Sequence, residues 1–207
     1  MLLAVSKAHP AEAVRAAYAA GQQAFGENYL QEALAKQKEL ADLAIAWHFI
    51  GPLQSNKTQA IAQHFSWVHS VDRLKIAERL NAARPADLPS LQVCLQVNVS
   101  GEASKGGVAV KEAAALAQAI VRLPRLQLRG LMAIPAPSHS IAIQRQQFRM
   151  VRELQAAMQA QGLALDTLSM GMSEDFPAAI AEGATIIRIG SAIFGARPTT
   201  ENKQARL

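Results

Sequence analysis

Two short segments near opposite ends of the chain carry the residues best suited to chemistry. Lys7 directly follows an apolar, strand-like run at residues 2–6. Near the other end, Arg188 lies in a second such run, which leads into Gly190 and Ser191. A lysine amine that loses its proton can condense with an aldehyde, and an arginine followed by a glycine and a serine supplies donors for a phosphate group. Together they predict a cofactor that carries both groups, pyridoxal phosphate.

The length and composition predict one domain over residues 1–207. The chain is 50% hydrophobic and 18% charged, which is enough for one well-filled core and too little for two large domains. No apolar stretch has the length of a membrane span, and the first residues have neither the basic flank nor the length of a signal peptide. We therefore expect a cytoplasmic protein with no membrane partner.

The single cysteine, Cys94, lies in an apolar run and is interpreted as a core residue. One cysteine cannot form an internal disulfide or a thiolate metal cluster. We predict no metal site.

The net charge of +5 raises the question of nucleic-acid binding. The basic residues are scattered singly through predicted helices, without aromatic residues between them, so we predict a solvated surface and no nucleic-acid partner. A positive potential would also attract a phosphorylated anion. The residues considered are Arg15, Lys36, Lys38, Arg73, Lys75, Arg79, Arg122, Arg125, Arg145, Arg149 and Arg152.

Strand-like runs alternate with Ala-rich amphipathic segments along the whole chain. This order requires parallel strands joined by right-handed crossovers, and eight such units close most simply into a (β/α)8 TIM barrel. An open, doubly wound sheet is the second possibility. The predicted strands are residues 2–6, 24–28, 47–51, 67–71, 91–99, 126–134, 167–170 and 185–189.

Polar residues stand within or just after most of these strands. In a barrel the carboxyl ends of the strands meet at one mouth, where the chemistry of such folds is found. A single polar residue at a strand end is most often a turn former, so the signal is their convergence. The residues are Lys7, Glu27, Asn28, His48, Gln54, Ser70, Asp72, Asn98, Ser100, Ser173, Gly190 and Ser191.

Lys7 has two interpretations. A lysine at a strand end commonly extends its ammonium group into water. Inside a barrel mouth the group loses hydration, its pKa falls, and the neutral amine can form a Schiff base.

The loops after the seventh and eighth strands are the usual place for phosphate in barrels. Ser173 is predicted to cap the helix that follows it. Gly190 leaves backbone N–H groups open, and Ser191 adds a hydroxyl. The alternative is an ordinary helix cap and a turn glycine.

Arg188 precedes Gly190 by two residues, so both point to the same side of the strand, toward the predicted mouth. Arginine is a common partner of the pyridine nitrogen of this cofactor. Because arginine stays protonated, it can only donate to that nitrogen, which makes the ring a weaker electron sink and favours racemase-type or non-catalytic use. The alternative is a salt bridge across the barrel to Glu27 or Asp72.

Six segments resemble the pyridoxal phosphate homeostasis protein family, also called the proline synthetase co-transcribed family. The similarity spans nearly the whole chain. The segments are residues 3–7, 25–29, 47–57, 130–135, 169–173 and 188–195.

The resemblance implies the N-terminal barrel of alanine racemase as the fold. It further implies that Lys7 carries the internal aldimine, that Arg188 faces the ring nitrogen, and that Asn28 lies beside the cofactor. The phosphate would be held by Ser173, Gly190 and Ser191.

Two features depart from the family pattern. Met1 leads almost directly into the first strand, whereas the family places a helix before it; this suggests a truncation or a misassigned start and an uncovered apolar groove on the barrel wall. His9 stands where the family often has a basic residue.

The related racemases use a tyrosine, on the face of the cofactor opposite the lysine, as an acid and base. This chain contains only Tyr18, in a predicted helix, and Tyr29. Without the opposite base, two-base racemisation lacks half of its proton-transfer machinery. We therefore expect a monomer in vitamin B6 homeostasis, without catalytic residues, that holds pyridoxal phosphate and passes it to apo-enzymes. The alternatives are a minor racemase or lyase and a cofactor-free barrel enzyme acting on a phosphorylated substrate.

Overall fold

The computed structural model describes residues 1–101 and 106–196. The strands are β1 (Leu2–Val5), β2 (Ala24–Glu27), β3 (Ala46–Phe49), β4 (Trp67–Val71), β5 (Leu91–Asn98), β6 (Val108–Ala109), β7 (Leu126–Met132), β8 (Thr167–Ser169) and β9 (Ile187–Ile189). The helices are α1 (Ala11–Ala19), α2 (Leu30–Glu39), the 3₁₀ turn η1 (Ser55–Lys57), α3 (Thr58–His64), α4 (Leu74–Ala83), α5 (Val110–Ile120), α6 (Ile141–Ala160), α7 (Phe176–Ala181) and α8 (Ser191–Phe194).

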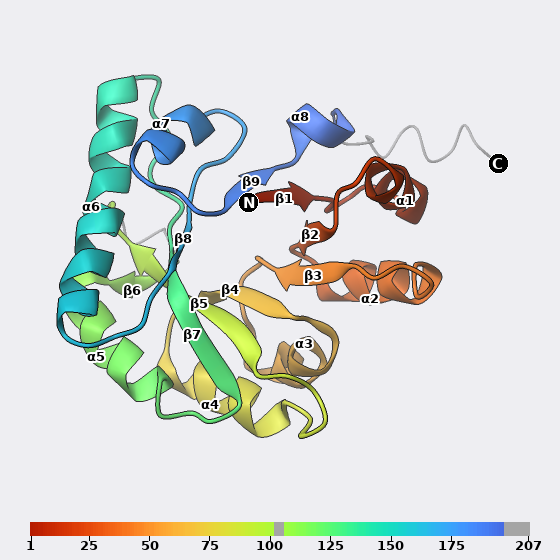
Figure 1. The fold of residues 1–207 in the computed structure, drawn as a ribbon, viewed down its shortest axis with the longest axis horizontal. Helices are drawn as coiled ribbons and strands as arrows, with labels where there is room; N and C mark the ends of the chain where they lie inside the picture. The colour runs from red at the N-terminus through yellow and green to blue at the C-terminus, as the bar shows by residue number, and fades with distance from the viewer. Residues whose placement is uncertain (102–105, 197–207) are drawn as a thin grey trace.

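The strands form a parallel barrel with the helices around it (Figure 1). Neighbouring strands follow the order β8-β7-β5-β4-β3-β2-β1-β9, and the two-residue β6, which the sequence did not predict, pairs with β5. Between β8 and β9 the circle closes through a bridge from Ser169 to Ile186 and a hydrogen bond from the Met170 N–H to the Ile186 carbonyl at 3.1 Å. The predicted (β/α)8 barrel is confirmed, and the open sheet is wrong.

Helix α5 illustrates why the helices cover the barrel. Ala113, Ala117 and Ile120 recur at helical spacing and are fully buried, whereas Lys111 and Glu112 are exposed. An apolar stripe of this kind must face the sheet, and burying one isoleucine contributes about 1.5 to 3 kcal/mol. The main core thus lies between the barrel wall and its helices.

Cys94 in β5 is fully buried, as the sequence predicted. Burial disfavours the thiolate and raises the pKa of the thiol to about 12. The thiol therefore stays protonated and acts as a small core group.

Two of the predicted boundaries that differ from the structure lie between β8 and β9. Ser173 does not cap α7, because the helix begins at Phe176 and Asp175 occupies the cap position. The Met172 N–H donates to the Asp175 carboxylate at 2.6 Å, and this local turn delays the helix. The last strand begins at Ile187, two residues later than expected.

The surface charges are less scattered than the sequence suggested. Lys38 is exposed, but Lys36 on the same helix is buried against carboxylates. Arg145, Arg149 and Arg152 of α6 all reach the carboxylate of Glu182. The solvated-surface interpretation therefore fails for Lys36 and is incomplete for these arginines.

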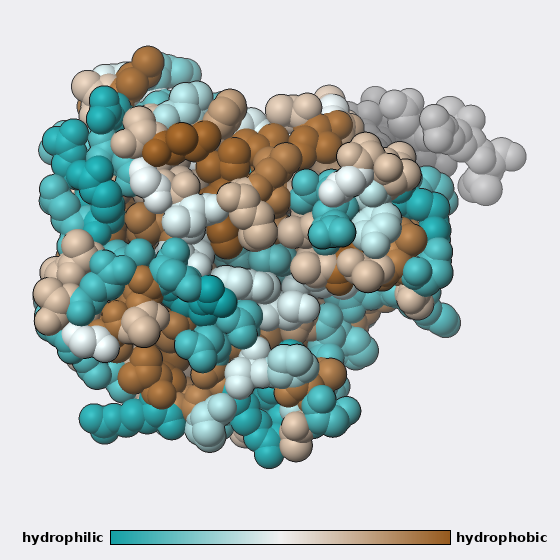
Figure 2. Space-filling model, viewed as in Figure 1, coloured by the Kyte–Doolittle hydropathy of each residue, from teal (hydrophilic) through white to brown (hydrophobic). Residues whose placement is uncertain are grey.

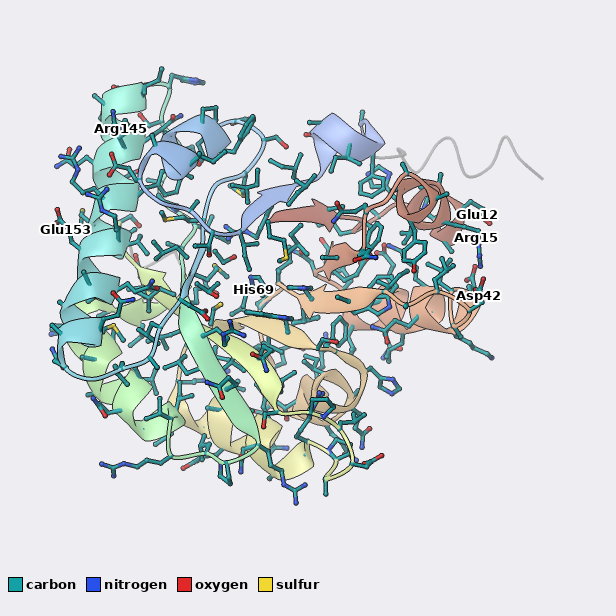
Figure 3. The ribbon with its side chains drawn as sticks, in the orientation of Figure 1. Glu12, Arg15, Asp42, His69, Arg145 and Glu153 are labelled. Atoms are coloured by element: carbon teal, nitrogen blue, oxygen red, sulfur yellow. The ribbon has the colours of Figure 1, made fainter. Side chains whose placement is uncertain are left out.

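The visible face of the molecule separates polar and apolar regions. Figure 2 shows hydrophilic residues along α6 and hydrophobic ones around α7, α8 and the start of β1. Figure 3 shows Arg15 and Asp42, which form an exposed ion pair, at the periphery. Across the described part of the chain, no helix combines the length and apolar character needed to cross a membrane. The cytoplasmic location stays a prediction.

Candidate functional site

A cavity of about 470 Å³ opens where the carboxyl ends of the strands meet. Loops after β1, β2, β3, β7, β8 and β9 contribute to its wall. The residues predicted for a cofactor all line it, namely Lys7, Asn28, Ser173, Arg188, Gly190 and Ser191. The structure therefore brings together side chains that are far apart in the sequence, while their contacts with a cofactor stay a prediction.

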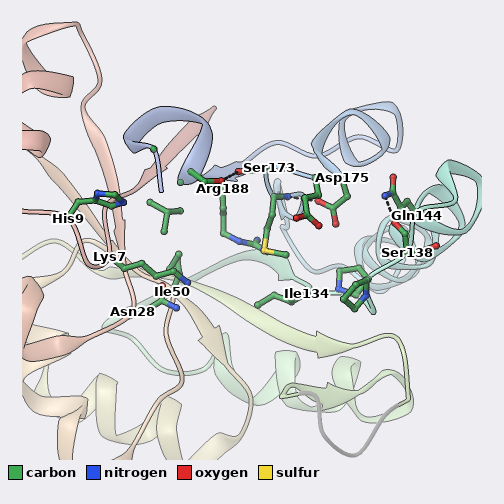
Figure 4. A pocket seen from close by; sticks show the side chains of 18 residues that line it. Lys7, His9, Asn28, Ile50, Ile134, Ser138, Gln144, Ser173, Asp175 and Arg188 are labelled. Carbon is green, nitrogen blue, oxygen red and sulfur yellow. Dashed lines mark hydrogen bonds between the residues drawn. The ribbon is translucent and has the colours of Figure 1, made fainter. Parts of the chain in front are cut away.

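The cavity is elongated, as the close view in Figure 4 shows. Lys7 and Asn28 lie toward one end, and Ser138 and Gln144 lie at the other. Arg188 is placed between them. The distant end was missed by the sequence analysis, because Gln144 belongs to the first turn of α6 and has no local sign of function.

A buried ionic cluster, which we define as Glu27, Glu32 and Lys36, supports the lysine end of the cavity. The hydroxyl of Ser6, the residue before Lys7, donates to Glu27 Oε1 at 2.6 Å. The Lys36 ammonium donates to the Ser6 carbonyl at 2.6 Å and to Glu27 at 2.7 Å. Burial raises the pKa of Glu27, and the nearby Lys36 ammonium opposes that shift.

The same cluster holds the residue after Lys7. The Ala8 N–H donates to Glu32 Oε1 at 2.6 Å, and Lys36 binds the same oxygen at 2.6 Å. Ala8 has a φ of 63°, a left-handed conformation that costs a residue other than glycine roughly 1 kcal/mol. The chain is therefore kinked directly after Lys7, and the hydrogen bond from Ala8 to Glu32 of the ionic cluster holds the kink in place.

At the other wall, Arg188 is 4% exposed and held by carbonyl and hydroxyl oxygens. Its Nη1 donates to the carbonyl and to Oγ of Ser169, at 2.6 and 2.9 Å, and its Nη2 donates to the Ala133 carbonyl at 3.0 Å. Burial lowers the pKa of Arg188 to about 10, so it remains protonated near neutral pH. The predicted alternative, a salt bridge to Glu27 or Asp72, is wrong, because each of these carboxylates pairs with a different cation.

The two serines predicted for a phosphate lie side by side. The Ser191 hydroxyl donates to Ser173 Oγ at 3.3 Å. Gly190 is tight against β1, since a Cβ added there would lie 3.3 Å from the Val5 carbonyl oxygen. The hydroxyls and the start of α8 thus form one polar corner of the cavity.

A close contact between the backbones of Asn28 and Gly51 fixes the position of Asn28. A Cβ added at Gly51 would lie 2.2 Å from the Asn28 carbonyl oxygen, so only glycine fits there. The Asn28 Oδ1 is buried and has no hydrogen-bond partner among residues 1–101 and 106–196. Such an atom points to a ligand that is required to satisfy it.

His9 also lines the cavity and connects two of its loops. Its ring stacks on Phe194 of α8 with ring centroids 5.1 Å apart. The contact ties the loop that carries Lys7 to the helix that begins at Ser191.

Several polar residues expected at the mouth do not line the cavity. His48 is the clearest case, because it is 1% exposed and bonded to His69 inside the barrel. Tyr18 and Tyr29, the two tyrosines of the chain, are also outside the lining. The other residues outside the lining are Glu27, Gln54, Ser70, Asp72, Asn98 and Ser100.

No role for His69, Ser169 or the ionic cluster was predicted from the sequence. A signal for the first two was present, because each is a polar residue inside a short strand: His69 stands between Val68 and Ser70 in β4, and Ser169 ends β8, which begins with Thr167. Period two places such residues on one face of a strand, which in a barrel is the interior.

Comparison with known proteins agrees with this geometry. The family described as "Alanine racemase, N-terminal domain" matches residues 1–198. The fold and the site thus define a barrel of the alanine racemase N-terminal class. A protein of Pseudomonas aeruginosa named "Pyridoxal phosphate homeostasis protein" is 66% identical over 95% of this chain and 84% of its own length. One of the same name from Escherichia coli is 52% identical over 95% of this chain and 85% of its own. The chain belongs to the pyridoxal phosphate homeostasis protein family.

A solved structure extends the comparison to three dimensions. PipY of Synechococcus elongatus, determined with PLP bound, is 45% identical and superposes with a TM-score of 0.88. The match covers 94% of this chain and 92% of PipY.

Proposed function

We propose that this protein binds pyridoxal phosphate (PLP) in the cavity at the barrel mouth and takes part in PLP homeostasis. The observation that carries the proposal is a single cavity lined by an amine, Lys7, on one side and by Arg188 with the Ser173 and Ser191 hydroxyls on the other. Family membership and the PLP bound in PipY support it.

The residues present fit this group in three respects. The volume of about 470 Å³ is in the usual range for small-molecule sites. The Asn28 Oδ1 lacks a hydrogen-bond donor that a ligand can supply. Arg188 keeps its Nε–H and one Nη2 hydrogen without a partner in the described residues, and it lines the cavity.

When bound, PLP supplies an electrophilic aldehyde, a pyridine nitrogen and a phosphate. In our proposal the Lys7 amine is the covalent attachment point. The Arg188 guanidinium is a permanent donor toward the ring nitrogen and cannot accept a proton from it. The phosphate is held by the corner made of Ser173, Gly190 and Ser191, where hydroxyl and N–H donors are available.

We further propose that the protein holds and releases PLP without turning over a substrate. The related racemases use a tyrosine as the second acid or base across from the lysine, and neither Tyr18 nor Tyr29 lines the cavity, whose other acid or base groups are His9, Glu174 and Asp175. In this proposal PLP-dependent apo-enzymes are the recipients and the protein is a cytoplasmic monomer. A sedimentation velocity run tests whether the protein is a monomer.

The alternative is a weak PLP-dependent racemase or lyase. The observation that favours it is the far end of the cavity near Ser138 and Gln144, which leaves room beside the proposed cofactor position. Deuterium uptake at Cα of L- or D-alanine in heavy water distinguishes the two. Exchange no faster than with free PLP supports the non-catalytic proposal, whereas faster exchange that is lost in Lys7→Ala supports the alternative.

The decisive experiment on binding uses the visible absorption of the protein after addition of PLP. We expect a band that borohydride removes and a reduced adduct on Lys7. Lys7→Ala should lose both, and Lys57→Ala, the control, should keep them. An adduct on Lys57, or on Lys105, which lies outside the described residues, would overturn the assignment.

A further inference from the structure

A chain of four hydrogen-bonded side chains crosses the interior of the barrel. We call it the interior relay and define it as Arg188, Ser169, His69 and His48. Arg188 Nη1 donates to Ser169 Oγ at 2.9 Å, Ser169 Oγ lies 2.7 Å from His69 Nδ1, and His69 Nε2 lies 2.9 Å from His48 Nδ1. His69 belongs to β4 and is fully buried, and Figure 3 shows it among the strands. The relay therefore links the wall of the cavity to the centre of the fold.

The composition of the relay is unusual for its position. Barrel interiors are filled mainly by branched apolar side chains, yet none of these four residues is more than 4% exposed. Buried polar groups destabilise a fold unless each is paired. Bulky apolar residues would fill the same space at no such cost, so the relay needs another explanation.

The donor-only chemistry of arginine and the acceptors available to Ser169 together set the bond directions in the relay. Arg188 can only donate, so Ser169 Oγ accepts from it. The described residues offer no acceptor for the Ser169 hydroxyl other than His69 Nδ1. Ser169 therefore donates to His69 Nδ1, which leaves the His69 proton on Nε2, donated to His48 Nδ1.

Both histidines are neutral in this arrangement, in agreement with their burial. Burial lowers the pKa of His48 to about 3 and that of His69 well below its usual value. The His48 ring is also fixed, because it stacks on Trp67 at 5.3 Å and 7°. The far end of the relay is thus anchored by packing.

We infer that His69 is a positioning residue for the cofactor: acting through Ser169, it holds the Arg188 guanidinium in the one orientation that leaves its remaining N–H groups directed at the cavity. This inference rests on the proposed function. His69 is not among the residues that line the cavity; its role is to keep the Ser169 hydroxyl turned away, so that Oγ is free to accept from Arg188.

The first test needs no cofactor. We expect ¹⁵N NMR of the histidine side chains to show His48 and His69 neutral, with the proton on Nε2, from pH 5 to pH 8. A protonated ring, or a proton on Nδ1 of His69, would overturn the bond directions and with them the inference. This result is independent of whether PLP binds at all.

The second test uses a matched pair of variants in protein loaded with PLP. In His69→Asn the amide oxygen can replace Nδ1 as acceptor for Ser169, whereas in His69→Gln the amide group reaches the position of Nε2 instead. We expect His69→Gln to shift the ¹⁵N resonance of the PLP ring nitrogen and to speed PLP release about tenfold, the scale of one hydrogen bond to a charged group. His69→Asn should stay within about twofold of the parent.

The outcomes separate three situations. Equal changes in both His69 variants, with equal loss of melting temperature, would mean that His69 only fills space, and would overturn the inference. If His69→Gln does not fold, Ser169→Ala replaces it and should give the same shift and release rate. If the parent protein takes up no PLP, the proposed function fails, and the histidine tautomers still decide the bond directions.

Discussion

The two walls of the cavity each hold one basic residue, Lys7 or Arg188, but they do so by opposite means. On the Lys7 wall the support is ionic, because Lys36 forms salt bridges to both Glu27 and Glu32. This cluster hydrogen-bonds the backbone of the residues before and after Lys7. On the Arg188 wall, the support is neutral, through Ser169 and two uncharged histidines. At the same barrel mouth, ionic contacts therefore position Lys7 and neutral hydrogen bonds position Arg188.

The difference follows from where each residue lies. Lys7 comes after its strand ends, so its backbone is free to move unless something fixes it, and Ala8 is moreover in a left-handed conformation. Arg188 is inside β9, where the sheet already fixes the backbone and only the guanidinium must be oriented. Strong ionic contacts are needed for a loop, whereas directional neutral contacts suffice on a strand.

The largest difference between the two walls should appear when Lys36, the centre of the ionic cluster, is replaced. Lys36→Met leaves Glu27 and Glu32 without their shared cation, and we expect a loss of about 3 to 5 kcal/mol in unfolding free energy, because an unpaired buried charge remains. Urea unfolding measures it. Lys38→Met on the same helix is exposed and should change stability by no more than about 0.5 kcal/mol. Equal effects of the two variants would show that the cluster does not support the fold.

Acidification should act on the two walls with opposite sign. The pKa values of His48 and His69 are lowered by burial, so below about pH 6.5 the unfolded chain binds protons that the folded chain does not, and stability falls until the folded pKa, about 3 for His48, is reached. At pH 5 the shift of the His48 pKa costs about 2 kcal/mol of stability relative to pH 7, and the lowered pKa of His69 adds to this loss in the same direction. The pKa of Glu27 is raised, so its protonation as pH falls favours the folded state.

Urea unfolding at pH 7 and pH 5 measures these contributions. His48→Gln should reduce the loss between the two pH values by about 2 kcal/mol, and Glu27→Gln should increase it. The same pH dependence in all three proteins would contradict the assignment of neutral histidines to the Arg188 wall.

A smaller effect sharpens the comparison at the phosphate corner, which belongs to the Arg188 wall. Ser191→Ala should weaken PLP retention by about 1 to 2 kcal/mol, the scale of one hydrogen bond to a charged group. Equilibrium dialysis against PLP measures it, and Ser66→Ala, an exposed serine just before β4, is the control. Equal losses from both variants would place the phosphate elsewhere.

The smallest expected effect concerns the kink on the Lys7 wall. Ala8→Gly relieves a left-handed conformation of roughly 1 kcal/mol but gives the unfolded chain more freedom, so we expect a net change within about 0.5 kcal/mol. Ala16→Gly, inside α1, should cost about 1 kcal/mol. Thermal unfolding of the two variants compares them, and a large loss in Ala8→Gly would argue that Ala8 is not strained.

Much of the fold could be predicted from the sequence, because a barrel is built from local alternation. Apolar runs and Ala-rich amphipathic stretches follow each other regularly, and apart from the missed two-residue β6 the errors lie at the ends of elements. Ser173 looked like a cap since acidic residues follow it, but the turn bond from Met172 to Asp175 moves the start of α7. This bond is local, but Ser173 and Asp175 are both suitable cap residues, and the sequence alone does not decide between them.

The candidate site was predicted in part for the same reason. Lys7 and Arg188 could be found because each stands out against an apolar run. Lys36 could not, since a lysine on an amphipathic helix looks solvated until Glu27 and Ser6 are brought against it by the barrel. The relay was hidden likewise, because its members come from four separate strands.

The closure of the barrel passes through Arg188 itself. Its N–H donates to the Gly171 carbonyl at 2.9 Å, and its side chain binds Ser169 in β8 and Ala133 just after β7. One residue thus acts as a clasp over the seam between β8 and β9, where the two ends of the strand order meet. We expect a ligand that engages this clasp to slow amide hydrogen exchange of Ile186 and Ile187, so that loading of the mouth can be read from backbone protons that no ligand atom touches.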